Sequence, residues 1–242
     1  MGQTTPRDLA VPATKTAAMR YLAEQAGHGY VLFQHGEVPA DRAMALLEKF
    51  DDRYRVLASR GARDHARLRG RSSARLVMFP KDHEPHTWYF WLLATEGDGH
   101  LPAAGNALDS RNPETRLRWA DQYELVSRPV RRRSGELHHV WTWVFTRKSY
   151  EGWQERLKKA AGRVRSSKER KPDYLVQQVD YLRAVPGFQG INRQKRALVL
   201  EADIPAAFHA SLNLRALGTV VDKRLAIFLD GRTLRTLVAP KG

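Results

Sequence analysis

The chain has 242 residues, and its 41 Lys and Arg against 26 Asp and Glu give a formal net charge of +15. Apolar residues make up 42% of it, enough for a folded body with a substantial core, so the surplus charge is expected at the surface. A surface of that sign attracts polyanions, of which nucleic acid is the commonest. The absence of cysteine excludes disulfides, zinc-thiolate sites and thiol catalysis. No apolar run approaches the ~20 residues that span a bilayer, and the N-terminus lacks the apolar core of a signal peptide, so we expect a cytoplasmic protein with no membrane partner.

The first part of the chain predicts helices and strands in alternation. Helices are predicted over residues 16–25 and 39–50, and strands over residues 29–35, 76–79, 86–95, 122–130 and 137–146. Between the second helix and the second strand, residues 53–75 contain eight arginines and one intervening acid, Asp64. We predict that this stretch is a basic and mobile connection. The last two strands are joined by Arg131, Arg132, Arg133, Ser134 and Gly135, which predicts an antiparallel pair with an arginine-rich tip.

The second part is more helical and more basic. A helix is predicted over residues 150–165, a further helix begins at Pro172, and a short one covers residues 190–200. The chain then returns to β structure, with a hairpin predicted around Asp230-Gly231 from strands 225–229 and 233–238. The predicted fold is α+β: an antiparallel sheet of ferredoxin or RRM type, a basic helical segment and a C-terminal hairpin. We expect an α+β domain over residues 1–148 and a helical segment with the closing hairpin over residues 149–242.

Three basic elements predict a nucleic-acid interface, because arginine binds phosphate in a bidentate manner and stacks on bases. They are the loop near residues 60–71, the tip of the arginine hairpin and the helix near residues 150–165. The candidate residues are Arg63, Arg67, Arg69, Arg71, Arg131, Arg132, Arg133, Arg156, Lys158, Lys159, Arg163 and Arg165.

Motifs for cofactor chemistry are missing. The chain has no GxxxxGK[ST] phosphate loop, dinucleotide fingerprint, GxSxG or HExxH, so no cofactor is expected. His83 and His86, with His100 further on, lie in a polar stretch without the other ligands that a metal site requires, so no metal is expected either.

Metal-independent cleavage of RNA requires a base near the 2′-hydroxyl, an acid near the leaving oxygen and cations around the phosphate. Suitable side chains flank the first predicted strand. The candidate catalytic residues are His35, His28, Tyr30 and Arg20. A structural role for a histidine at a strand end is the alternative, and the sequence does not decide which group is acid and which is base.

The strand-helix unit GYVLFQHGEVPADRAMALLEKF, the later antiparallel strands and the arginine-rich helix together resemble the CRISPR repeat-RNA endonucleases of plasmid-borne type IV systems. The resemblance implies binding of a repeat hairpin, metal-independent cleavage at its 3′ base, and retention of the product in a multisubunit effector complex. The family's C-terminal glycine-rich loop is not recognisable in residues 211–242. The segment YLRAVPGFQGINRQKRA is also similar to uncharacterised proteins of plasmids and conjugative elements.

Three hypotheses follow. The first is an endoribonuclease that processes CRISPR precursor RNA at a hairpin. The second is a non-enzymatic protein of a plasmid or conjugative element that binds duplex DNA in replication, transfer or regulation. The third is a structural subunit whose basic surface docks on a larger ribonucleoprotein.

Overall fold

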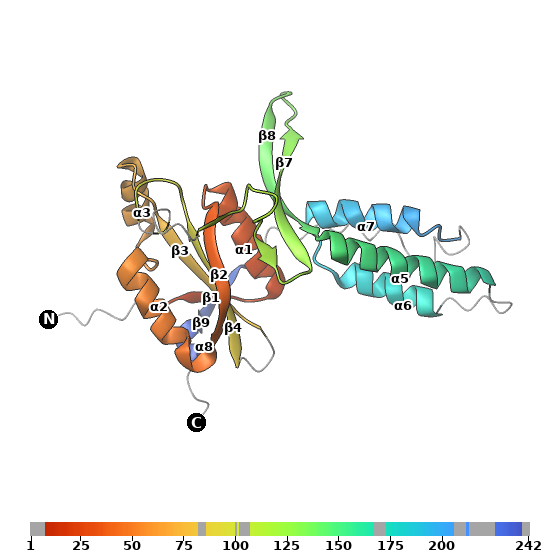
Figure 1. Ribbon diagram of the computed structural model, residues 1–242, viewed down its shortest axis with the longest axis horizontal. Coiled ribbons are helices and arrows are strands. Elements are labelled where there is room, and N and C mark those ends of the chain that lie inside the picture. The colour runs from red at the N-terminus through yellow and green to blue at the C-terminus, as the bar shows by residue number, and fades with distance from the viewer. Residues whose placement is uncertain are drawn as a thin grey trace. The chain divides into compact units, whose positions relative to one another are not determined.

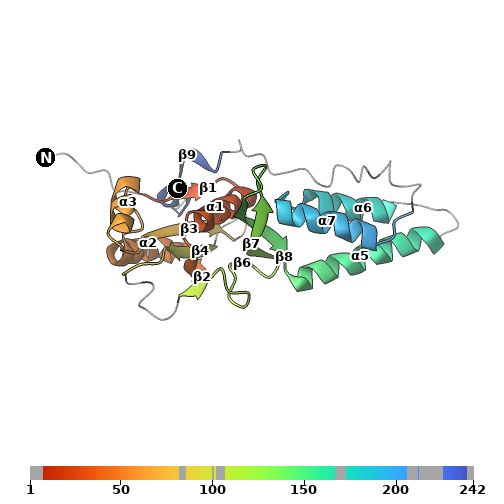
Figure 2. The ribbon, with the colours of Figure 1, turned by 90° about the horizontal axis from the view of Figure 1, so that it is seen from above.

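A computed structural model describes residues 8–81, 86–99, 101, 107–166, 173–205, 212 and 226–238. The fold is mixed α+β with several antiparallel sheets, as predicted. It divides into two compact units, unit 1 from residues 1–117 and 225–242 and unit 2 from residues 118–224. Figures 1 and 2 show the helices and strands of both units. The division expected at residues 148 and 149 falls inside unit 2, where the second antiparallel pair packs with the helices that follow it.

Unit 1 is built on a four-stranded sheet. Its strands are β2 (Leu32–Pro39), β3 (Ala74–Pro80), β4 (Thr87–Ala94) and β5 (Leu108–Asp109), in the order β3-β4-β2-β5, and all neighbours are antiparallel. Helix α2 (Ala40–Tyr54) connects β2 to β3, and β4 lies between these two parallel strands. This is the split β-α-β arrangement of ferredoxin-like sheets.

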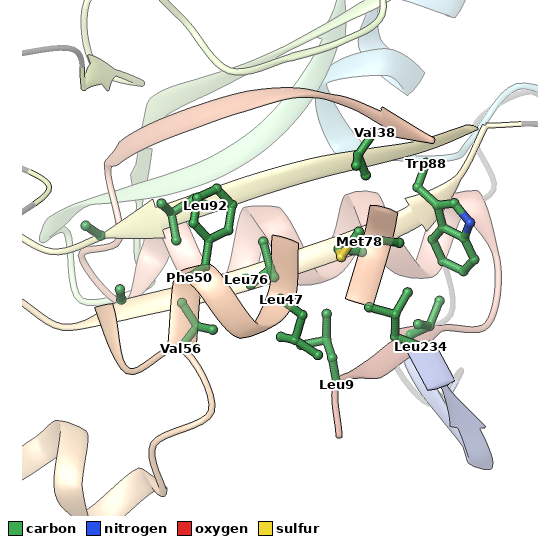
Figure 3. Packing of buried hydrophobic residues seen from close by; sticks show 14 of the residues in the cluster. Leu9, Val38, Leu47, Phe50, Val56, Leu76, Met78, Trp88, Leu92 and Leu234 are labelled. Atoms are coloured by element: carbon green, nitrogen blue, oxygen red, sulfur yellow. The ribbon is translucent and has the colours of Figure 1, made fainter. Parts of the chain in front are cut away.

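The core of unit 1 lies between α2 and one face of this sheet (Figure 3). Because side chains alternate along a strand, Leu76 and Met78 of β3 share that face with Trp88 and Leu92 of β4. Helix α2, which covers the stretch predicted as a helix over residues 39–50, contributes Leu47 and Phe50. The cluster is completed by these buried residues from both ends of the chain: Leu9, Val11 and Leu234.

Helix α1 (Lys15–Gly27) lies at the opposite face of the sheet. Its Tyr21 hydroxyl accepts a hydrogen bond of 2.8 Å from Nη1 of Arg75, whose side chain leaves β3 on the face away from Leu76. The Thr14 side chain caps the helix by accepting from the backbone N–H of Ala17, as an N-cap threonine does.

The C-terminal β structure pairs with a strand near the N-terminus. Strand β9 (Phe228–Thr233) is antiparallel to β1 (Ala10–Pro12), and a bulge interrupts their register. The Asp230-Gly231 pair, with Gly231 at φ +71°, lies within β9. Most of the stretch predicted as the second hairpin strand is helix α8 (Leu234–Val238), because its first residue, Leu234, is buried beside Leu9 in the core.

The arginine-rich stretch predicted as a mobile connection is ordered, and that prediction is wrong. Helix α2 extends to Tyr54, residues 60–68 form helix α3 (Arg60–Leu68), and Ala74 begins β3. The Ser59 side chain caps α3 by accepting from the N–H of Ala62, and Gly70 follows the helix at φ +73°. Arginine, alanine and leucine are good helix formers, and the Ser59 cap and the contact of Arg63 with the Val56 carbonyl oxygen add to that preference, although no residue of α3 is fully buried.

Unit 2 combines a three-stranded sheet with three helices. The sheet is an antiparallel meander of β6 (Arg118–Trp119), β7 (Tyr123–Arg131) and β8 (Leu137–Phe145). The helices are α5 (Arg147–Ser166), α6 (Asp173–Ala184) and α7 (Gln189–Glu201), and α5 packs against the other two (Figure 2). Their shared core is formed by Leu157, Ala160, Ala161, Val164, Leu175, Val179, Leu182, Ile191 and Leu198. Within the described ranges, no helix combines the length and apolarity needed to cross a membrane.

Candidate nucleic-acid interface

A groove of about 600 Å³ lies on unit 2 between the β7–β8 hairpin and helix α7. The hairpin and α7 lead away from their junction in different directions (Figure 1). The hairpin side is lined by Arg128, Pro129, Val130, Val140 and Thr142. The helix side includes Gly190, Arg193, Arg196, Ala197 and Leu200.

The groove depends on a close approach between α7 and β8 at one end. The N–H of Gly190 donates to Oγ1 of Thr142 at 3.0 Å, and Oε1 of Gln194 accepts from the N–H of Phe145 at 2.7 Å. A Cβ atom at Gly190 would lie 2.5 Å from the carbonyl oxygen of Trp143, so only glycine fits there without a shift of the backbone. These contacts fix the angle at which α7 leaves the sheet.

The charges in the groove are all positive. Arg193 and Arg196 are three residues apart on α7, so they share a face, and Arg128 approaches from β7. None of the three guanidinium groups forms an ion pair with an acid of the described part of the chain. Leu200, of which 80% is exposed, adds an apolar side chain next to these cations. Positive charge beside apolar surface suits the phosphates and sugars of a nucleic-acid backbone.

The three arginines at the tip of the hairpin continue this basic surface. Arg131 ends β7, and Arg132 and Arg133 lie in the turn, which Gly135 closes at φ +86°. All three side chains are exposed. Arg132 pairs with Glu136 at 3.3 Å, an exposed contact that contributes little stability and can be exchanged for a phosphate.

The basic residues predicted on the helix near residues 150–165 all lie exposed on α5, but three of them are engaged within unit 2. The guanidinium of Arg156 lies over the Trp153 ring and that of Arg163 over the Tyr174 ring, 4.6 Å from its centroid. Arg165 pairs with Asp203 at 2.6 Å. Lys158 and Lys159 make no ion pair within the described residues, so they are the most available of these five predicted cations.

The candidate arginines of unit 1 are distributed around α3. Arg63 is half-buried, Arg67 and Arg69 are exposed at its C-terminal end, and the backbone at Arg71 forms an isolated β-bridge with that at Asp98. Nη2 of Arg67 lies 3.8 Å from the position that a Cβ atom would take at Gly29. The helix therefore brings a cation to the end of α1, which the linear sequence does not indicate.

The four candidate catalytic residues lie in different environments. Arg20 pairs with Glu24 at 2.8 Å on α1, and His28 is exposed at the C-cap of that helix. Tyr30 is buried, with its hydroxyl 3.0 Å from Oγ of Ser73 and the Arg75 guanidinium over its ring.

His35 lies three residues into β2, about 10 Å along the strand from its first residue. Burial lowers the pKa of its imidazole, which favours the neutral form. His28 and Tyr30 therefore lie just before β2 in the chain, and His35 lies further along that strand.

The histidines considered as metal ligands are only partly within the described residues. His83 and His100 of the histidine cluster lie outside the described residues, and the described part contains no group of three potential ligands.

Comparison of the chain with protein-family models, with curated proteins and with solved structures finds no match. The candidate site therefore rests on its geometry alone.

Sequence reasoning missed Arg128, Arg193 and Arg196 as site residues. Their signal is weak because they are spread over β7 and α7 and stand outside the dense arginine runs. The i, i+3 spacing of Arg193 and Arg196 was the only pattern available.

Proposed function

We propose that the protein binds structured nucleic acid, in the first place an RNA hairpin, through the groove and the hairpin tip of unit 2. The observation that carries the proposal is a set of three arginines, Arg128, Arg193 and Arg196, that line the groove beside apolar side chains and form no ion pair with any described residue. Cations left without acid partners lose little when they bind phosphate, because no existing ion pair has to be broken.

The groove is better suited to contacts with the backbone of an A-form RNA helix than to contacts with base edges. Such helices are recognised mainly by shape and by backbone contacts, and arginine supplies bidentate donors to phosphate oxygens. The three arginines supply the charge of the lining, and Gln189 and Asn192 add two amide side chains that can form hydrogen bonds to the RNA. Duplex DNA is the alternative ligand, since a two-stranded ribbon or a helix also fits its major groove.

Binding of labelled probes tests the proposal. Fluorescence anisotropy would compare an RNA hairpin, single-stranded RNA of the same sequence and a DNA duplex, each with excess non-specific competitor. The expected result is that the hairpin binds most tightly and that Arg193→Gln with Arg196→Gln weakens it more than an exposed, acid-paired control, Arg147→Gln with Arg60→Gln. Preference for the DNA duplex would replace RNA by DNA as the ligand, and equal weakening by both double variants would refute the groove as the site.

Cleavage of the bound RNA is a second candidate function, in which a CRISPR precursor RNA is cut at its repeat hairpin and the product stays in an effector complex. The favouring observation is His28, an exposed histidine next to Gly29, which the guanidinium of Arg67 approaches. An imidazole beside a cation matches the groups that cleavage at a 2′-hydroxyl requires.

The cleavage test uses a structured RNA in EDTA, with a 2′-deoxy substitution at the scissile position as the control substrate. Cleavage that the substitution stops, and that His28→Ala abolishes while His35→Ala does not, would support the assignment. Intact RNA under these conditions would reduce the function to binding.

A further inference from the structure

A second cavity, of about 220 Å³, lies within unit 1 and is separate from the groove of unit 2. Helix α1, the segment between α2 and α3, strand β3 and strand β9 all contribute to its wall. Its polar side chains are Tyr21, Arg63 and Arg75, and its apolar wall includes Leu57, Val77 and Phe228.

The two arginines of this cavity are only partly satisfied. Arg63 donates from Nη1 to the carbonyl oxygen of Val56 at 3.4 Å, a long hydrogen bond. Arg75 donates from Nη1 to the Tyr21 hydroxyl at 2.8 Å. The Nε atoms of both side chains are buried and have no hydrogen-bond acceptor. Each arginine therefore keeps a donor out of water without a partner, which is costly for a charged group.

No acid neutralises this pair. Within the described residues neither Arg63 nor Arg75 forms an ion pair, and the nearby Asp64 is directed to Arg60 at 3.7 Å. Burial, and then the charge of Arg75, lower the pKa of Arg63. The pKa of Arg75 is shifted by burial, which lowers it, and by Tyr21 and Tyr30, which together raise it overall. Two cations that repel each other in a partly dehydrated cavity favour an anion between them.

The size and chemistry of the cavity limit the choice of anion. At about 220 Å³ the cavity is smaller than the ~300 Å³ at which sites for drug-sized ligands begin, so it can enclose a phosphate group but not a whole nucleotide. Guanidinium groups match the oxygens of phosphate in fork geometry. The apolar wall of Leu57 and Phe228 can contact a sugar attached to that phosphate.

We propose that this cavity binds a phosphomonoester, with Arg63 and Arg75 as its ligands and the Tyr21 hydroxyl holding Arg75 in place. The phosphate belongs either to a free mononucleotide or to the terminal phosphate of a nucleic-acid chain. Tyr21 is fixed by an edge contact with Phe228, whose ring centroid is 5.0 Å away, so the cavity wall and the arginine anchor are coupled. The proposal does not depend on the groove of unit 2.

The test is titration of the full chain with AMP, and with adenosine as the ligand that lacks phosphate. Binding is measured by calorimetry and by the shift in melting temperature. We expect AMP to bind and adenosine not to bind. Arg63→Gln should weaken AMP binding about tenfold or more, because a charge-assisted contact is lost. The matched control is Arg60→Gln on the same helix, where the side chain is 91% exposed, and it should leave AMP binding unchanged. No binding of AMP, or equal binding by the two variants, would overturn the proposal.

Two further measurements complete the test. Tyr21→Phe keeps the ring against Phe228 but removes the anchor of Arg75, so it should weaken AMP binding even if Arg63→Gln fails to fold. A short RNA with a 5′-phosphate is then compared with the same RNA with a 5′-hydroxyl. A gain that depends on Arg63 identifies the chain terminus as the source of the phosphate, and AMP binding without such a gain identifies a mononucleotide.

Discussion

Replacing the three groove arginines should change how the affinity for an RNA hairpin depends on salt concentration. Each phosphate that a cation neutralises contributes ~0.7 to 0.9 to the slope of log K against log salt. Arg128, Arg193 and Arg196 form no ion pairs with described residues, so each is free to neutralise one phosphate. Changing all three to Gln should therefore flatten the slope by about 2 to 2.7.

The predicted difference is large enough to measure. Between 50 and 200 mM salt, the wild type should lose about 20- to 40-fold more affinity than the triple variant. The assay is anisotropy of a labelled RNA hairpin at a series of salt concentrations. The control removes three exposed arginines that are paired with acids, Arg60, Arg111 and Arg147, so the net charge falls by the same amount. If the control flattens the slope as much as the groove variant, binding reflects net charge, and the assignment of the groove is refuted.

Three further predictions concern unit 2. Gly190→Ala places a Cβ atom 2.5 Å from the Trp143 carbonyl oxygen and should lower the free energy of unfolding by ~1 to 3 kcal/mol in thermal or urea unfolding. The control, Gly162→Ala, has no atom within 4 Å of its Cβ atom and should not destabilise the protein. Equal stability of the two variants would contradict the close packing of α7 on β8. Lys195 is buried, with Nζ donating to the Val185 carbonyl oxygen at 2.6 Å, and burial lowers its pKa to about 8. Above that pH the unfolded chain binds more protons than the folded chain, so the free energy of unfolding should rise from pH 8 toward about pH 10.4. Lys195→Met should remove this rise. Lys158→Ala with Lys159→Ala on α5 should flatten the salt slope by less than 1, and a change as large as that of the groove variant would move the interface to α5.

The regular elements of the fold were largely predictable because their apolar patterns are strong. The continuous apolar run of β4, from Trp88 to Ala94, and the helical spacing of Leu47 and Phe50 in α2 are local sequence patterns that follow from burial. Helix α3 was missed because charged residues dominate it and none of its residues is fully buried, so it has no core-facing apolar stripe, and its formation depends on the Ser59 cap and on helix propensity.

Pairing between distant segments was the harder part. Strand β9 pairs with β1 more than 200 positions earlier in the chain, and a local Asp-Gly signal cannot reveal a partner that far away. The same limit applies to both cavities. The groove joins β7 to α7, and the phosphate cavity joins α1 to α3 and β9, so their lining residues share no motif.

The arginines of the chain separate into groups that composition cannot distinguish. Some are paired with acids, as Arg111 is with Glu96 and Asp109, and some lie on aromatic rings, as Arg163 does on Tyr174. A third group faces a cavity and has no acid partner in the part of the chain that the structure describes, and Arg193 of unit 2 and Arg63 of unit 1 represent it. An arginine of the first group must break an existing ion pair to bind a phosphate, whereas an arginine of the third group breaks none. It follows that ligand binding should depend on these few unpaired arginines and much less on the total charge of +15.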